Sequence, residues 1–263
     1  MRHIILSIAF LFIFLSQFAQ NKFYVKVDSV FNQYIQNKSI PGAVLLIQHN
    51  GKTIIHKAYG NAQIKDINNQ PLSTPVAMTT EHLFDIASLT KVVGTTTSIM
   101  LLVDQGLLQV DDPVCKYIPG FNTPEKKNIT IRHLLTHTAG LLEWYPMYYR
   151  SNNKKHTFAL IDSLPLAFPI GAQRKYSDLG FTVLGEIIEK ISGQAMEQFM
   201  KEKIFEPLGM LHTGYLPNKN QLIAPTSFGN AYEYRMVHDP KLGFVFNEID
   251  PKSWNGWRQY NLY

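Results

Sequence analysis

The sequence predicts an α+β fold: an antiparallel sheet flanked by helices, with an inserted, mostly helical subdomain. Three observations lead to this prediction. The chain has 263 residues, enough for one large domain or two small ones. Its hydrophobic content of 45% and charged content of 17% suit a globular protein with a sizeable core. An apolar pattern with helical spacing precedes a hairpin signal, which favours a helix packed on an antiparallel sheet.

The first predicted elements are a helix and a hairpin. Apolar residues recur at helical spacing over residues 23–35. The apolar, β-branched runs 43–48 and 53–58 flank Asn50-Gly51, a dipeptide typical of tight hairpin turns. The segment 61–80 is polar and contains prolines, so we interpret it as a connecting loop.

The middle of the chain is predicted to be helical. A polar start at Ser88 runs into an apolar segment that ends near Gly106, which indicates a buried helix. The stretch 141–171 is aromatic and contains prolines, as is typical of a loop that shapes a site. Further helical patterns cover residues 129–136, 179–191 and 196–205. The first of these stops at residues 137–140.

The first 19 residues predict a secretory signal peptide. A short basic start at Arg2 is followed by an apolar run from Ile4 to Leu15, and Ala19 offers a small residue for cleavage. The run is shorter than the roughly 20 apolar residues of a membrane span. We therefore expect an exported protein, periplasmic or extracellular, with no stable membrane insertion after cleavage. The alternative is an uncleaved membrane anchor.

Composition argues against several function classes. The net charge is +5 without a basic run, so no nucleic-acid partner is implied. Cys115 is the single cysteine, which excludes an internal disulfide and a cysteine-based metal site. His133 and His137 have the i, i+4 spacing of metal ligands, but no acidic residue that acts as a base lies between them. We expect neither a bound metal nor a cofactor.

Ser88-Leu89-Thr90-Lys91 predicts nucleophilic chemistry. On a helix, positions i and i+3 share a face, so Ser88 and Lys91 project side by side. A serine hydroxyl is a poor nucleophile until another group takes its proton, and a desolvated lysine can take or relay it. The competing interpretation is a helix N-cap serine followed by a solvated lysine. The apolar helix that follows favours the catalytic interpretation.

Tyr176-Ser177-Asp178 forms a second candidate site. It precedes a buried helix and follows Arg174 and Lys175. A tyrosine among cations can serve as a base. The competing interpretation is a helix N-cap formed by Ser177 or Asp178, and the two interpretations are compatible.

These motifs give the chain a resemblance to a known family. The segments that carry it are, in order, PGAVLLIQHNGKTIIHKAYG, FDIASLTK, QGLLQVDDPVCKYIP, ITIRHLLTHTAGL, YSDLGFTVLGEIIEKISGQ and IFEPLGMLHTGY. Together they resemble the serine β-lactamase-like hydrolases, which include class C β-lactamases, D-alanyl-D-alanine carboxypeptidases and related esterases. The resemblance runs from about residue 23 to 238 and implies the β-lactamase/transpeptidase-like fold.

The resemblance implies a role for each candidate residue. Ser88 would be the acyl-accepting nucleophile and Lys91 its proton partner. Tyr176 would act as base in acylation and as acid toward the leaving group. Asp178 occupies a substrate-binding position at which the family has asparagine. A carboxylate cannot donate a hydrogen bond to a substrate carbonyl as an amide does, but it can pair with Lys91 and hold it charged.

The C-terminal part departs further from the family. The family's third motif, Lys-Thr-Gly or His-x-Gly, lies on a late strand that contributes to the oxyanion hole. His212-Thr213-Gly214 matches the residue types of the third motif, but it follows residues 207–210, which resemble the family's loop before the later segment. We therefore expect an incomplete hydrolase domain over residues 20–239 without the late strands. Residues 240–263 are expected to form a divergent tail.

The sequence thus predicts an exported serine hydrolase that acts through an acyl-enzyme. Expected substrates are small esters, D-amino-acid peptides such as those of peptidoglycan, or β-lactams, with a generic esterase or peptidase favoured over a dedicated β-lactamase. The alternative is an impaired or non-catalytic family member that at most binds peptidoglycan-like ligands.

Overall fold

A computed structural model describes residues 22–66, 70–145, 147, 151, 153–218, 220–226, 236–239 and 243–246. The chain divides into two compact units. The first contains the N-terminal part up to Asp85 and a later segment around residues 220–226, and the second begins at Ile86. The predicted signal peptide, residues 1–19, lies outside the described residues. No helix in the described part of the chain is long and apolar enough to span a membrane.

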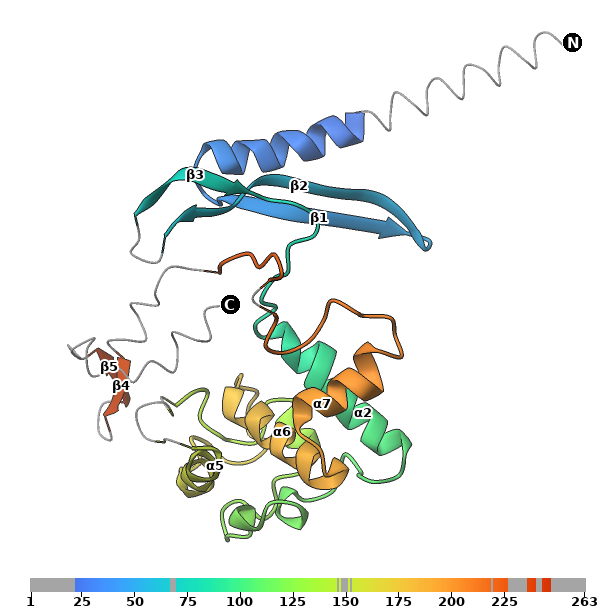
Figure 1. Cartoon of the computed structure of the whole chain (residues 1–263). Helices are drawn as coiled ribbons and strands as arrows, with labels where there is room; N and C mark the ends of the chain where they lie inside the picture. Colours follow the sequence, from blue (N-terminus) through green and yellow to red (C-terminus); the bar gives the residue numbers. More distant parts are fainter. Residues whose placement is uncertain are drawn as a thin grey trace, which may run out of the picture. The chain divides into compact units, whose positions relative to one another are not determined.

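The first unit contains a three-stranded antiparallel sheet (Figure 1). Its strands, in the order β1-β2-β3, are β1 (Gly42–His49), β2 (Lys52–Lys65) and β3 (Pro71–Ala77). Asn50 and Gly51 connect β1 to β2 with positive φ angles of 49° and 72°. Two successive positive φ values are the geometry of a type I′ turn, whose twist matches that of the flanking strands. The predicted hairpin is confirmed.

The interpretation of residues 61–80 as a loop is wrong. β2 continues to Lys65, and β3 pairs with it through Asn61 opposite Ala77 and Lys65 opposite Pro71. β3 lies at the edge of the sheet, where prolines are tolerated because one side of the strand donates no ladder hydrogen bonds. Most of its side chains are exposed, so the strand lacks the apolar alternation by which strands are recognised.

The predicted N-terminal helix packs on this sheet (Figure 1). Residues 22–36 are helical, and the ring of Phe31 stacks on that of Tyr59 with centroids 4.6 Å apart. Asp28 Oδ1 accepts hydrogen bonds from Lys57 Nζ and Tyr59 OH, both at 2.7 Å. Burial, together with the Asp28 carboxylate, raises the pKa of Tyr59 to about 12. The expected helix-on-sheet arrangement is confirmed.

The second unit is built from helices around one main core (Figure 1). α6 packs against α2, α3 and α7, and its residues Leu184, Ile187 and Ile188 are fully buried. Gly193 ends α6 with a φ of 69°. The helical elements are η1 (Lys91–Thr96), α2 (Thr97–Asp104), η2 (Val114–Lys116), η3 (Pro119–Phe121), α3 (Ile131–Leu135), α5 (Lys154–Ser163), α6 (Asp178–Ser192), α7 (Met196–Met200) and η4 (Lys201–Phe205).

Two features of this unit differ from the sequence prediction. α5 lies inside the stretch 141–171 that was expected to be a loop; Ile161 is its single buried residue, so its apolar pattern is weak. The helix after Ser88 begins at residue 89 and passes through the π-helical η1 before it becomes α2. Gly94 lies in η1, where a Cβ atom would come within 2.7 Å of Met200 Sδ. A glycine there lets α7 approach the η1 backbone closely.

A short hairpin follows later in the chain. It consists of β4 (Met236–Asp239) and β5 (Gly243–Phe246), which pair antiparallel with Met236 opposite Phe246. Its strands lie on both sides of residue 240, where the sequence suggested that a divergent tail begins.

Candidate active site

The site is built first at the N-terminus of the helix that follows Ser88. Ala87 adopts a left-handed conformation with a φ of 43°, and Lys91 N donates a hydrogen bond to Ser88 O at 3.1 Å. This turn places the two side chains on one face, and Lys91 Nζ donates to Ser88 Oγ at 3.2 Å. The side-by-side arrangement expected from the i, i+3 spacing is confirmed. Ser88 is exposed, so its hydroxyl is accessible to a ligand.

Tyr176 meets Ser88 across a sequence separation of 88 residues. Its hydroxyl donates to Ser88 Oγ at 2.7 Å. Ser88 Oγ therefore accepts from both the tyrosine and the lysine. Because a hydroxyl has two lone pairs and one proton, both lone pairs are then in use and its own proton points away from both donors.

Asp178 pairs with Lys91, as the departure from asparagine suggested. Its Oδ1 lies 2.6 Å from Lys91 Nζ, and the lysine side chain is only 16% exposed. Burial by itself would lower the pKa of Lys91, but hydrogen bonds to Asp178 and Tyr176 outweigh it and raise this pKa above its ordinary value. The ammonium also lies 4.9 Å from the ring centroid of Tyr176. Lys91 is thus a permanently charged donor at neutral pH.

The backbone around Tyr176 is held by the start of α6. Ser177 caps this helix, accepting from Gly180 N at 3.2 Å, while its own hydroxyl donates to Leu142 O at 2.7 Å. Asp178 N donates to Glu143 O at 2.8 Å. The N-cap interpretation of this motif is confirmed, and the same cap fixes the direction in which Tyr176 leaves the helix.

His137 lies near the site, although the sequence analysis considered it only for its metal-ligand spacing with His133. Its Nδ1 accepts from Ser177 N at 3.1 Å, and its carbonyl accepts from Lys175 N at 2.9 Å. Its ring lies against Tyr176, with centroids 4.7 Å apart. The sequence signal for a structural role was its position just after a predicted helix. In the structure, the backbone of His137 turns there with a φ of 60°.

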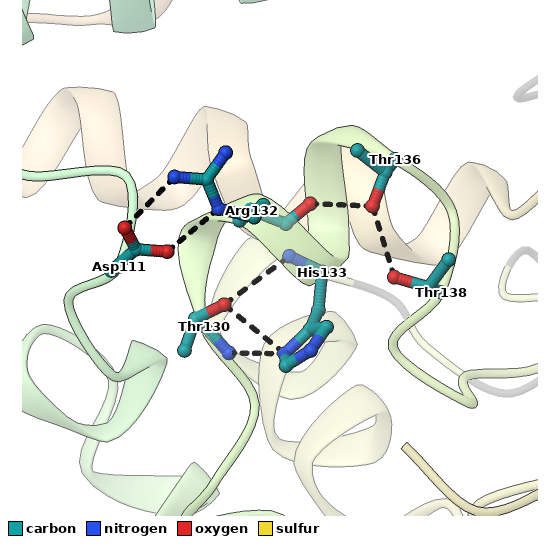
Figure 2. Close-up of polar contacts among 6 residues, drawn as sticks. All are labelled: Asp111, Thr130, Arg132, His133, Thr136 and Thr138. Atoms are coloured by element: carbon teal, nitrogen blue, oxygen red, sulfur yellow. Dashed lines mark hydrogen bonds and ion pairs between the residues drawn. The ribbon is translucent and has the colours of Figure 1, made fainter. Parts of the chain in front are cut away.

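The helix before His137 is anchored by its own polar contacts (Figure 2). Thr130 N donates to His133 Nδ1 at 3.1 Å, and His133 N donates to Thr130 Oγ1 at 3.3 Å, which closes a capping box at the start of α3. Arg132 binds Asp111 through two nitrogens at 2.7 and 2.8 Å. Thr136 and Thr138 hydroxyls lie 2.9 Å apart, on either side of His137. Figure 2 shows these contacts gathered at both ends of α3.

Two further candidates have other surroundings. His133 and His137 each use Nδ1 as an acceptor from a backbone N–H. In the part of the chain that the structure describes, no group of three or more His, Cys, Asp or Glu could hold a metal ion. His212-Thr213-Gly214 lies in a turn after η4, where Thr213 N donates to Met210 O at 3.1 Å, rather than on a strand.

Comparison with known families decides the relationship. A family model described as Beta-lactamase matches residues 27–235. The chain belongs to the beta-lactamase family. This confirms the family resemblance and the fold class expected from the sequence.

Individual relatives in this family span different reactions. The chain is 32% identical over 205 residues to an "N-acetylmuramyl-L-alanine amidase" of Bacillus subtilis (strain 168), covering 73% of this chain and 46% of the relative. It is 33% identical over 221 residues to a "Putative D-alanyl-D-alanine carboxypeptidase" of Escherichia coli (strain K12), covering 77% and 50%. The chain therefore spans about half the length of the curated relatives it matches.

Solved structures show the same beta-lactamase-like fold. EstCE1, described as a hydrolase with promiscuous acyltransferase activity, superposes with a TM-score of 0.68 at 24% identity. The match covers 90% of this chain and 68% of EstCE1.

Proposed function

We propose that this protein is a serine hydrolase that forms an acyl-enzyme on Ser88. The observation that carries the proposal is the contact of Ser88 Oγ with two proton-handling groups, Lys91 Nζ at 3.2 Å and Tyr176 OH at 2.7 Å. A nucleophile within hydrogen-bond reach of its base, with a third group orienting that base, is the signature of covalent catalysis. Membership of the beta-lactamase family supports the same reaction class.

The ion pair with Asp178 supports one distribution of the proton-transfer roles. Because Lys91 remains protonated, it donates hydrogen bonds and does not accept the Ser88 proton. Tyr176 is the other side chain in contact with Ser88 Oγ, so in its phenolate form it accepts that proton. Lys91 then stabilises the negative charge at the centre of the site without changing its own protonation state.

The reaction proceeds in two halves. Ser88 Oγ forms a bond to the substrate carbonyl carbon while its proton passes to Tyr176, and the tetrahedral intermediate collapses as Tyr176 returns that proton to the leaving group. Water then attacks the seryl ester with the same assistance, which releases the acid and restores the Ser88 hydroxyl.

We propose small esters and D-amino-acid peptides, such as those of peptidoglycan, as substrates ahead of β-lactams. An asparagine at position 178 would donate to a substrate carbonyl, whereas the Asp178 carboxylate only accepts and is already engaged by Lys91. Substrates that do not need that donor are therefore favoured. The names of the amidase and carboxypeptidase relatives support a peptidoglycan-derived substrate.

We further propose that the protein is exported after removal of residues 1–19. The basic start and apolar run of this segment support a signal peptide. Intact mass of the protein secreted by a bacterial host tests this: a chain that begins at Gln20 is the expected result, and a full-length, membrane-associated chain would favour the uncleaved anchor.

Intact mass after incubation with a fluorophosphonate, a serine-directed acyl mimic, tests the enzymatic proposal. We expect one adduct on wild type and none on Ser88→Ala. Ser163→Ala is the matched control, since Ser163 lies exposed at the end of α5, and it should label like wild type. If wild type has native circular dichroism but no adduct, the hydrolase proposal is wrong and a binding role for peptidoglycan-like ligands replaces it.

A further inference from the structure

We infer that His137, in its neutral form, is the positioning residue that holds Tyr176 against Ser88. For its kinetic consequences the inference rests on the proposed function. Its structural consequences rest on the geometry of the Tyr176 segment alone.

The contacts of His137 bracket Tyr176 in the sequence. Its carbonyl accepts from Lys175 N at 2.9 Å, and its Nδ1 accepts from Ser177 N at 3.1 Å. The backbone on both sides of Tyr176 is thereby tied to one residue. The imidazole also lies against the Tyr176 ring, with centroids 4.7 Å apart, and against Phe181 at 5.1 Å. Main chain and ring of the tyrosine are therefore both fixed by His137.

This arrangement requires an unprotonated Nδ1. A neutral imidazole with its proton on Nε2 presents a lone pair at Nδ1 to the Ser177 N–H. An imidazolium carries protons on both nitrogens, so its Nδ1–H would face the Ser177 N–H and the hydrogen bond would be lost. Protonation of His137 should thus release the segment that carries Tyr176.

The charges around His137 favour the neutral ring. Burial lowers its pKa below the ordinary value, and the nearby cations Lys91 and Arg174 lower it further, while Asp178 opposes them. The phenol of Tyr176 also lies beside the imidazole ring. Since the folded-state pKa is depressed, the stability contributed by this contact is intact above the unfolded-state value of about 6.5. It is lost as the pH falls through the lowered pKa.

Two substitutions distinguish the role of the His137 Nδ1 acceptor from the role of the His137 ring. His137→Asn keeps an acceptor oxygen near the position of Nδ1, tolerates a φ of 60° and does not titrate. His137→Phe keeps an aromatic ring beside Tyr176 but has no acceptor for Ser177 N. His133→Asn is the matched control, because His133 Nδ1 also accepts a backbone N–H, that of Thr130, and does so within the α3 capping box.

Fluorophosphonate labelling of the full chain as a function of pH is the kinetic test. For His137→Phe we expect a loss of roughly tenfold or more at neutral pH, since a small misplacement of a catalytic group costs up to about 10² in rate. His137→Asn should label nearly as fast as wild type at neutral pH. Its rate should fall less steeply in acid, because wild type must also keep His137 deprotonated. His133→Asn should retain the wild-type profile.

Hydrogen exchange at the Ser177 amide is the structural test and needs no activity. We expect slow exchange in wild type and His137→Asn at neutral pH. Exchange should be fast in a folded His137→Phe, and for wild type it should exceed that of His137→Asn in acid. Equal exchange rates of the Ser177 amide in wild type and both variants at every pH would overturn the inference. The same holds if the labelling rates of wild type and His137→Asn fall identically at acidic pH. An unlabelled wild type with this exchange pattern would refute the proposed hydrolase while leaving His137 as the positioning residue.

Discussion

At the residue scale, the main feature of the site is the hydrogen bonding of the Ser88 hydroxyl. Ser88 Oγ accepts from both Lys91 and Tyr176, so its own proton has no partner in this pair while both are protonated. Activation requires one of them to lose its proton. Because Asp178 holds the lysine charged, Tyr176 is the group proposed to give up its proton and act as the base.

Asp178→Asn should move the ascending limb of the pH–rate profile to lower pH. The substitution removes the negative charge that raises the pKa of Lys91, so the Lys91–Tyr176 pair loses a proton more readily. The midpoint of fluorophosphonate labelling against pH measures this shift. Glu143→Gln is a suitable control, since Glu143 pairs with Lys175 outside the contacts of Ser88. An unchanged midpoint in Asp178→Asn would show that the Asp178 carboxylate does not influence proton transfer at the site.

Tyr176→Phe should lower the labelling rate by roughly 10²- to 10⁴-fold, the usual contribution of a general acid or base. The substitution removes only the hydroxyl that contacts Ser88 Oγ and keeps the ring against His137. Circular dichroism should therefore remain that of wild type. Wild-type labelling by this variant would transfer the base role to Lys91.

At the element scale, the site depends on the N-termini of two helices, and different kinds of contact hold each of them in place. The first carries Ser88 and Lys91 within a single turn, so local spacing suffices to bring them together. The second, the start of α6, is set by hydrogen bonds to residues 142–143 and to His137. The α6 cap therefore contributes to stability and to the site at once.

Ser177→Ala should lower the free energy of unfolding by about 1 kcal/mol or more. The helix loses its N-cap, which typically costs 0.5–2 kcal/mol. The partly buried Leu142 carbonyl also loses its donor. Urea denaturation followed by circular dichroism measures the change. Ser163→Ala, at the exposed end of α5, should change the midpoint far less. Equal effects of the two substitutions would contradict the proposed importance of the cap.

At the scale of the whole molecule, the buried core is unevenly distributed. Nearly all fully buried apolar side chains of the described residues belong to the second unit, among them Phe121, Leu134 and Leu184. The sheet of the first unit buries few, and Leu46 is 54% exposed. Because local opening is easiest where little apolar surface is buried, the two units should differ in stability.

Hydrogen exchange should therefore be slowest in α6 and markedly faster in β1–β3. The measurement is amide exchange of the full chain under native conditions. Leu184→Ala, in the core of the second unit, should speed exchange throughout that unit. Comparable protection of the sheet and α6 would indicate that the exposed apolar side chains of the sheet are covered in solution.

Features encoded locally could be predicted from the sequence, and features encoded by distant contacts could not. Asn50-Gly51 specifies its turn by itself, and Ser88 and Lys91 meet through helical spacing. The contact of Tyr176 with Ser88 spans 88 residues and was expected only because of the family resemblance. β3 was missed because an exposed edge strand with prolines carries no apolar alternation. The contact of His137 with Ser177 has no periodic signal at all.

The π-helical segment η1 sets the direction in which Ser88 and Lys91 point relative to α2. A π turn closes i to i+5 hydrogen bonds, so it holds about one residue more than an α turn. Each residue of an α-helix advances the direction of its side chain by about 100°, and each residue of a π turn advances it by less. The direction in which Lys91 points relative to α2 is thus fixed by a count of residues between them. If η1 closed as α-helical turns with all of its residues kept, the helix would stay continuous, yet Ser88 and Lys91 would rotate relative to α2 and away from Tyr176.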